Sequence, residues 1–137
     1  MFYPAQFEQI GERYNISFRD IPEAITCAEQ RDQAPKMAEA AILSALGGYF
    51  TDRRQIQLPS QALEGEILIA IPMSVFAKVL LLNAMLEQNI SNVDLAKRIN
   101  IQQQEMQHIL SPHHSTPIDR IELALAALGK QLAMTTA

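Results

Sequence analysis

Apolar and polar residues in the first third of the chain alternate with a period of two, which is the pattern of half-buried β-strands. Extended segments are predicted at residues 2–7, 14–18 and 25–28. A turn at Gly11-Glu12 separates the first two, so we expect them to pair as a hairpin. A second turn is expected at Asp20-Ile21-Pro22-Glu23, because proline fixes its own φ and drives the preceding residue into extended geometry.

A helix is predicted after the third strand. Its apolar residues recur at helical spacing and form one face: Ala38, Ala41, Ile42, Ala45, Leu46, Tyr49 and Phe50. We expect Asp32 to be its N-cap and Pro35 to lie in its first turn, where a missing N–H does no harm. Residues 56–59 are extended, residues 60–65 form a loop, and residues 66–71 form a last strand. The result is a β-β-β-α-β module with one helix on a small sheet.

After Pro72 the pattern becomes purely helical. Helices are predicted at residues 72–88, 92–99 and 102–110, with a fourth that has Pro117 in its first position and ends at Gly129. Ser91 and Thr116 are the expected N-caps of the second and fourth helices, and Asn100 is an expected left-handed turn residue. The predicted fold class is therefore α+β, with an α/β front module at residues 1–71 and an all-α back module at residues 72–137.

The second and third helices of the back module show a helix-turn-helix pattern. Ala96 is the small residue where the helices cross, Asn100-Ile101 is the turn, and Met106 and Ile109 are apolar anchors. Glutamine offers a donor and an acceptor together, which suits an adenine edge. The predicted DNA-binding residues are Ser91, Lys97, Arg98, Gln102, Gln103, Gln104, Gln107, His108 and Thr116. Lys97, Arg98 and Arg120 and the N–H groups near Ser91 and Thr116 are assigned to phosphates. The alternative is a plain helical bundle with a solvated glutamine face.

Charged residues are distributed unevenly between the two modules. The net charge is −4, with six Lys/Arg against ten Asp/Glu in residues 1–71 and five against five in residues 72–137. An acidic front module repels nucleic acid and attracts a basic partner, although mild acidity can also serve solubility alone. A neutral back module must gather its cations on one face to bind DNA, because phosphate contacts dominate affinity; dimerisation would double that patch.

The sequence gives little support to catalysis or metal binding. Cys27 is the one cysteine, which excludes an intramolecular disulfide and fits a reduced cytoplasmic setting. We see no secretion signal and no apolar run long enough to span a bilayer. His108, His113 and His114 match no zinc spacing and are expected to be ordinary polar residues. No Ser/His/Asp set or Gly-rich phosphate loop is present, so no catalytic residue, metal or cofactor is predicted.

The chain resembles the HicB antitoxin family over nearly its whole length. The resemblance rests on segments in both modules: Tyr3-Pro4-Ala5, residues 18–26, 37–46, 49–50, 52–54, 58–60, 71–83, 113–119 and 127–130. The turn Asp-Ile-Pro-Glu-Ala at residues 20–24 and the helical segment Lys-Val-Leu-Leu-Leu-Asn at residues 78–83 are its most specific parts.

This resemblance implies a fold and a function for each module. In the family the front module is a partial ribonuclease H-like fold without catalytic function, and it blocks a HicA-type toxin, a small and generally basic mRNA-cleaving ribonuclease. The back module binds the operator of its own operon, usually as a dimer or tetramer, and we favour the Cro-type helix-turn-helix version over a ribbon-helix-helix. The expected toxin contacts are Asp20, Ile21, Pro22 and Glu23.

The sequence departs from the family pattern in two places, and two alternative functions stay open. The entry to the first helix, residues 31–35, lacks the family's usual acidic pair, and the third back helix has no arginine or lysine, with His108 near that position. One alternative is a stand-alone regulator whose front module senses a ligand, and a remote one is a nuclease of ribonuclease H type. The apolar residues Leu80, Leu81, Leu82 and Met85 fit either a dimer interface or a helix buried all round.

Overall fold

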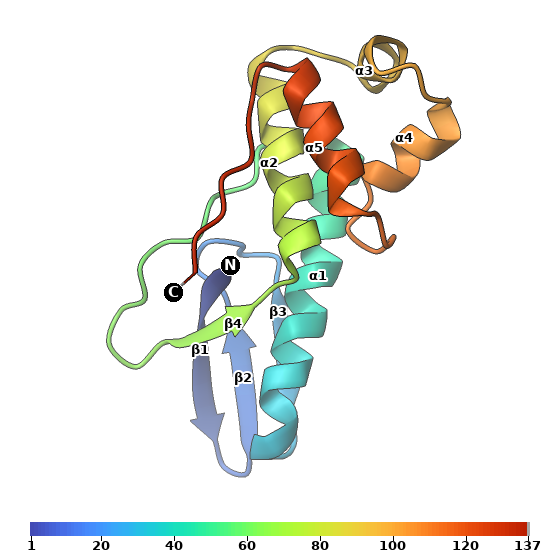
Figure 1. Cartoon of the computed structure of the whole chain (residues 1–137). Coiled ribbons are helices and arrows are strands. Elements are labelled where there is room, and N and C mark those ends of the chain that lie inside the picture. The colour runs from blue at the N-terminus through green and yellow to red at the C-terminus, as the bar shows by residue number, and fades with distance from the viewer. Residues whose placement is uncertain (137) are drawn as a thin grey trace. The chain divides into compact units, whose positions relative to one another are not determined.

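The computed structural model describes residues 1–136, and they form two compact units. One comprises residues 1–49 and 56–72; the other comprises residues 50–55 and the chain from residue 73 onward. The first unit holds β1 (Phe2–Ile10), β2 (Arg13–Ser17), β3 (Ile25–Ala28), most of α1 (Ala34–Asp52) and β4 (Ile67–Ala70) (Figure 1). The predicted β-β-β-α-β order is confirmed.

The four strands form one antiparallel sheet in the order β3-β2-β1-β4. β1 is longer than predicted, because its pairing with β2 continues to Ile10 opposite Arg13. Gly11 closes this hairpin with a φ of 63°, a conformation that glycine adopts without steric strain. The hairpin expected between the first two strands is therefore confirmed.

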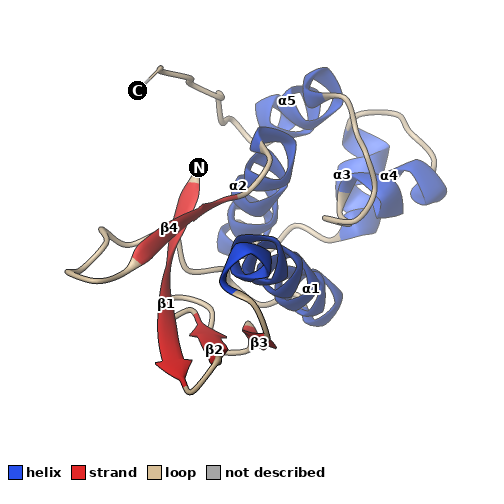
Figure 2. Ribbon diagram, turned by 90° about the horizontal axis from the view of Figure 1, so that it is seen from below, coloured by secondary structure: helices blue, strands red, loops and turns tan. Residues whose placement is uncertain are grey.

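The helix α1 covers one face of the sheet (Figure 2). Tyr3, Ala5 and Ile16 are fully buried on that face, because side chains alternate along a strand, and Ile42 and Leu46 of α1 are buried as well. The hydroxyl of Tyr3 donates to the backbone oxygen of Gln57 at 2.8 Å. Burial raises the pKa of Tyr3 well above its ordinary value, with the charge of Asp20 and the hydroxyl of Tyr49 adding to the shift.

The predicted N-cap of α1 is wrong. Asp32 lies inside a short 3₁₀ turn, η1 (Arg31–Gln33), which runs directly into α1, and Gln30 is the residue that precedes the turn. Ala34 already has helical geometry, so no extended residue is left at which the Asp32 side chain could cap the first N–H groups of α1. Pro35 does lie in the first turn of α1, as predicted.

The second unit contains α2 (Met73–Glu87), α3 (Asn92–Arg98), α4 (Gln103–Ile109) and α5 (Ile118–Ala127). α2 packs along α5, and α3 contacts both α4 and α5. Leu81, Leu82 and Met85 of α2 are at most 1% exposed, and Leu80 is half-buried. The chain itself therefore covers these residues, which favours a helix buried all round over an open dimer interface. Of the helices formed by residues 1–136, none has the length and apolar character needed to cross a membrane.

The turns of the second unit follow the predicted chemistry with one exception. Ser91 caps α3 by accepting a hydrogen bond from the Asp94 N–H at 3.1 Å, Asn100 has a φ of 55°, and Gly129 follows α5 with a φ of 74°. Thr116 does not cap α5. Pro117 is the extended residue before that helix, and the buried Thr116 hydroxyl faces the backbone oxygen of His108 at 3.5 Å instead.

Candidate functional site

The helices α3 and α4 are joined by a tight turn and pack through small and apolar side chains. Leu95 and Ala96 of α3 and Met106 of α4 are at most 1% exposed. The N–H of Ile101 donates to the backbone oxygen of Ala96 at 3.0 Å, which closes the turn at Asn100. Because Ala96 has only a methyl side chain, the turn can return close to α3. This packing fixes which side of α4 faces away from the core.

The glutamines of this segment are exposed. Gln102 precedes α4 and makes no capping hydrogen bond through its side chain. Met106 and Ile109 are buried, so Gln103 and Gln107, one turn apart, lie on the opposite side of the helix. Gln104 is exposed too, and His108 is half-buried. The fold therefore gathers the predicted glutamines at the start of α4 and along it, and we call Gln102, Gln103, Gln104 and Gln107 the glutamine face.

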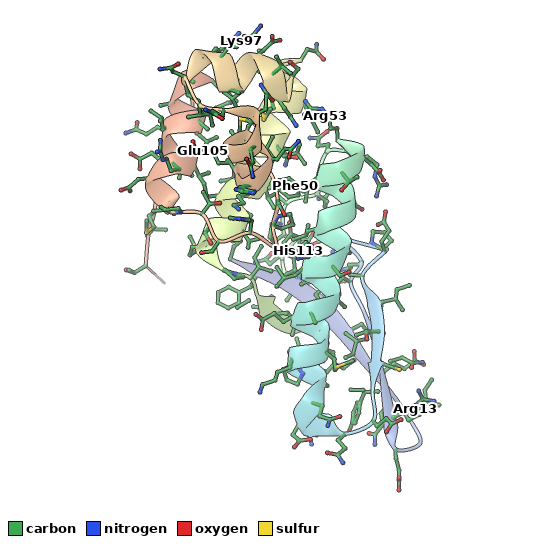
Figure 3. The ribbon with its side chains drawn as sticks, turned by 90° about the vertical axis from the view of Figure 1, so that its right-hand side faces the viewer. Arg13, Phe50, Arg53, Lys97, Glu105 and His113 are labelled. Carbon is green, nitrogen blue, oxygen red and sulfur yellow. The ribbon has the colours of Figure 1, made fainter. Side chains whose placement is uncertain are left out.

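Few free cations stand near the glutamine face. Lys97 and Arg98 are exposed in the last turn of α3, and Figure 3 labels Lys97 there. Arg120 pairs with Glu105 of α4, with 3.4 Å between guanidinium and carboxylate, and Lys78 is buried. Ser91 is exposed but its hydroxyl oxygen accepts the capping bond, while Thr116 is 9% exposed. Of the predicted phosphate contacts, Lys97 and Arg98 offer the most accessible charge.

Lys78 on α2 was not predicted as a site residue, although a lysine in an otherwise apolar helix is a visible signal. It is 1% exposed, and its ammonium donates to the backbone oxygens of His108 at 3.1 Å, Ser111 at 2.7 Å and His114 at 2.6 Å. Burial lowers the pKa of Lys78 to about 8. The rings of His108 and His114 stack with centroids 3.8 Å apart and planes 9° from parallel. Lys78 and this stack join the end of α4 to the loop that follows.

Arg53 is a second residue that the sequence did not single out. It follows α1 with a φ of 51°, a left-handed conformation that non-glycine residues rarely adopt, and Figure 3 labels it beyond the end of that helix. Its guanidinium donates to the side-chain oxygen of Asn92 and, at 2.9 Å, to the backbone oxygen of Ile90. These bonds hold the segment that leads into α3.

The predicted toxin-binding turn, Asp20-Ile21-Pro22-Glu23, has two buried and two exposed residues. Asp20 is 9% exposed and accepts hydrogen bonds from the N–H and hydroxyl of Ser60, and Ile21 is fully buried. Pro22 and Glu23 are exposed, and Glu23 accepts a 2.7 Å hydrogen bond from the hydroxyl of Tyr49. Asp20 and Ile21 thus position the turn, while Pro22 and Glu23 form its surface.

Arg19 holds the loop that leads into β4. Its guanidinium donates to Glu66 at 2.9 Å and to the backbone oxygen of Gln61. The pKa of Glu66 is lowered, first by the hydrogen bond from Arg19 and then by the one from the Leu63 N–H. Near this loop, Phe2 and Leu68 are about half exposed on paired strands. This surface combines apolar side chains with an ordered, charged loop.

Within residues 1–136, no three His, Cys, Asp or Glu side chains come close enough together to hold a metal ion. The Cys27 thiol is free and half-buried on β3, where it accepts a 3.4 Å hydrogen bond from Arg13. The two candidate surfaces predicted from the sequence are the glutamine face and the surface around Pro22 and Glu23, and both are exposed.

Comparison with known proteins identifies the class. Residues 2–80, more than half of the chain, match the family model described as the HicB_like antitoxin of bacterial toxin-antitoxin systems. The chain is 46% identical to Antitoxin HicB 2 of Photorhabdus laumondii over 134 residues, covering 98% of this chain and 95% of the relative. It is 42% identical to Antitoxin HicB of Escherichia coli K12 over 135 residues, covering 98% of each. A more distant relative, Antitoxin HicB of Pseudomonas fluorescens, is 29% identical over 121 residues, covering 88% and 83%.

The chain therefore belongs to the HicB-like antitoxin family, and it is an antitoxin of a toxin-antitoxin system. The family resemblance inferred from the sequence alone is confirmed.

Proposed function

We propose that this antitoxin neutralises a HicA-type ribonuclease with its front module, residues 1–71, and represses its own operon with its back module, residues 72–137. In this proposal it acts in the cytoplasm as a homodimer or homotetramer. The front module is a partial ribonuclease H-like fold, supported by its antiparallel sheet with α1 on one face. The back module is a Cro-type helix-turn-helix, supported by the tight turn between α3 and α4.

The observation that carries the DNA-binding proposal is the glutamine face. Side chains at the start of a recognition helix reach the base edges of the major groove, and Gln103 and Gln104 occupy that position on α4. A glutamine amide can donate to and accept from one adenine. Lys97 and Arg98 are assigned to backbone phosphates. The Thr116 side chain is buried, so at this position only the nearby backbone N–H groups are assigned to phosphates. A dimer would present two such faces and double the phosphate contacts.

The toxin-binding proposal rests on charge and exposure. Residues 1–71 hold ten acidic against six basic residues, which favours a basic partner. Within the predicted turn, Pro22 and Glu23 are the residues that a partner can reach, and Asp20 acts by keeping the turn against Ser60. The mechanism proposed is occlusion: the front module covers the active site of the ribonuclease and thereby prevents access of mRNA.

The DNA-binding proposal is tested with the DNA upstream of the antitoxin's own gene, labelled and competed with scrambled duplex at two salt concentrations. We expect the purified protein to hold the upstream DNA against scrambled competitor. Gln103→Ala and Gln104→Ala should lower this preference, by about 1–3 kcal/mol if each reads one base. Gln33→Ala, an exposed glutamine of η1, is the matched control and should leave it unchanged. Equal binding to upstream and scrambled DNA would contradict sequence reading by α4.

A further inference from the structure

The ammonium group of Lys78 is buried, which is unusual for a lysine in a small helical unit. Removing a charged amine from water costs several kcal/mol unless hydrogen bonds replace its hydration. Here all three ammonium hydrogens have acceptors, one at the end of α4 and two in the next loop, at Ser111 and His114. The His108–His114 ring stack ties the same two segments together independently. The loop of residues 111–115 is thus fixed relative to α4.

This arrangement determines which backbone groups the loop turns outward. A trans peptide group points its C=O and its N–H in opposite directions, and none of the described peptide bonds is cis. The His114 carbonyl points inward to the ammonium, so the Ser115 N–H points away from it. Ser111 is followed by Pro112, which has no N–H, and His108 is followed by a residue inside α4. Of the three peptide groups held by Lys78, one therefore directs a free N–H away from the core.

The outward side of this loop has the chemistry of a phosphate contact. No residue of the described chain accepts a hydrogen bond from the Ser115 N–H, and Ser115 and His113 are both exposed (Figure 3 labels His113). An N–H, a hydroxyl and an imidazole can all donate to phosphate oxygens. Three carbonyl oxygens that would repel an anion are turned inward onto Lys78. The loop follows directly after α4, the helix that carries Gln103, Gln104 and Gln107.

We propose that Lys78 is a positioning residue that presents residues 111–115 as a phosphate-contacting segment of the DNA surface, with Ser115 and His113 donating to the phosphodiester backbone. This inference rests on the proposed DNA binding and assigns a contact segment beyond the glutamine face. Phosphate contacts set register and affinity but carry no sequence information, so their loss weakens specific and non-specific binding alike.

The direct test uses the wild-type protein and follows its backbone amides by NMR during titration with the upstream duplex. We expect the Ser115 amide to shift and to become protected from solvent exchange, together with the amides of Gln103 and Gln104. If the α4 amides respond and the Ser115 amide does not, the phosphate segment is wrong while DNA binding stands. If neither responds, the proposed DNA binding fails as well. A Ser115 shift with inorganic phosphate but not with the duplex would make this a site for free anions and overturn the proposal.

Variants separate positioning from simple structural support. Lys78→Met, once shown to unfold cooperatively, should lose affinity for upstream and scrambled DNA by the same factor, roughly tenfold if one hydrogen bond to a charged phosphate is lost. His113→Ala, whose side chain is exposed, should do the same to a smaller extent without affecting the fold. A variant that lost only the preference for upstream DNA would instead indicate a disturbed α4, and the positioning role would be withdrawn. Gln103→Ala, which should lose preference first, provides the contrast.

Discussion

Asp20 accepts two hydrogen bonds from Ser60, one from the backbone N–H at 2.8 Å and one from the hydroxyl at 2.6 Å. Asp20 is 9% exposed, and its carboxylate ties the turn after β2 to a segment 40 residues later in the chain. This pair explains why the turn that presents Pro22 and Glu23 has a defined shape. The four predicted contact residues therefore have two roles. Asp20 holds the turn in place from the buried side, and Pro22 and Glu23 form its exposed surface.

Removing that support should destabilise the front module. Asp20→Ala leaves the Ser60 N–H and hydroxyl without their acceptor, and we expect a loss of about 2 kcal/mol in the free energy of unfolding, because hydrogen bonds to charged groups contribute on that scale. Urea unfolding of the full chain measures it. Ser60→Ala keeps the N–H bond and should lose less. Equal stability of Asp20→Ala and wild type would show that the pair contributes nothing.

Tyr3 makes stability depend on alkaline pH. Its pKa is raised by burial, so the folded chain keeps the phenol proton at pH values where the unfolded chain, with a pKa near 10.0, loses it. Unfolding then releases a proton, and the free energy of unfolding falls as pH rises above that value. At pH 7 Tyr3→Phe should be less stable than wild type by about 1 kcal/mol, for the lost bond to Gln57. This gap should shrink from pH 10 upward in urea titrations, and a constant gap would rule out the proposed linkage.

The carboxyl of Glu66 should titrate below its ordinary range. The hydrogen bond from Arg19 is the main cause and the Leu63 N–H the second. In Arg19→Gln the pKa of Glu66 should rise toward its ordinary value, because the largest cause of the lowering is removed while the Leu63 N–H bond persists. Side-chain NMR titration gives both values directly. An unchanged Glu66 pKa in the variant would mean that the ion pair is absent in solution.

Arg53 and Asn92 should behave as one unit in stability measurements. Arg53→Gln and Asn92→Ala each break the same bond, so we expect single losses of about 1 kcal/mol and a double variant that is clearly less destabilised than their sum. Additive losses would show that the two side chains act independently. The bond from Arg53 to the Ile90 oxygen, which only the Arg53 variant removes, should make that variant the less stable of the two.

Periodicity predicted the order of elements well, because strands and helices bury apolar residues at spacings that are visible along the chain. The caps were harder. Ser91 and Asn100 behave as expected, but Asp32 and Thr116 do not, since a 3₁₀ turn and an extended Pro117 take the positions that these side chains would need. Local rules name residues that can cap; the backbone around them decides whether they do.

Long-range polar contacts were beyond sequence reasoning. Lys78 bonds to carbonyls 30 to 36 residues away, and Arg53 reaches the turn before α3 across 37 residues. Nothing local distinguishes Arg53 from its neighbour Arg54, and Lys78 stood out only as a charge in an apolar helix. The exposure of Gln103 and Gln107 could be predicted, because helical spacing alone places them away from the buried Met106 and Ile109.

The central claim, that the front module occludes a ribonuclease, is most directly tested by RNA cleavage. A HicA-type toxin, the partner proposed above, would be assayed on mRNA alone and with increasing antitoxin, using Glu23→Lys and, as a matched charge reversal elsewhere in the same unit, Glu39→Lys. We predict complete inhibition near stoichiometric antitoxin, a weaker inhibition by Glu23→Lys and no change with Glu39→Lys. Cleavage that continues at full rate in the presence of excess wild-type protein would contradict the account.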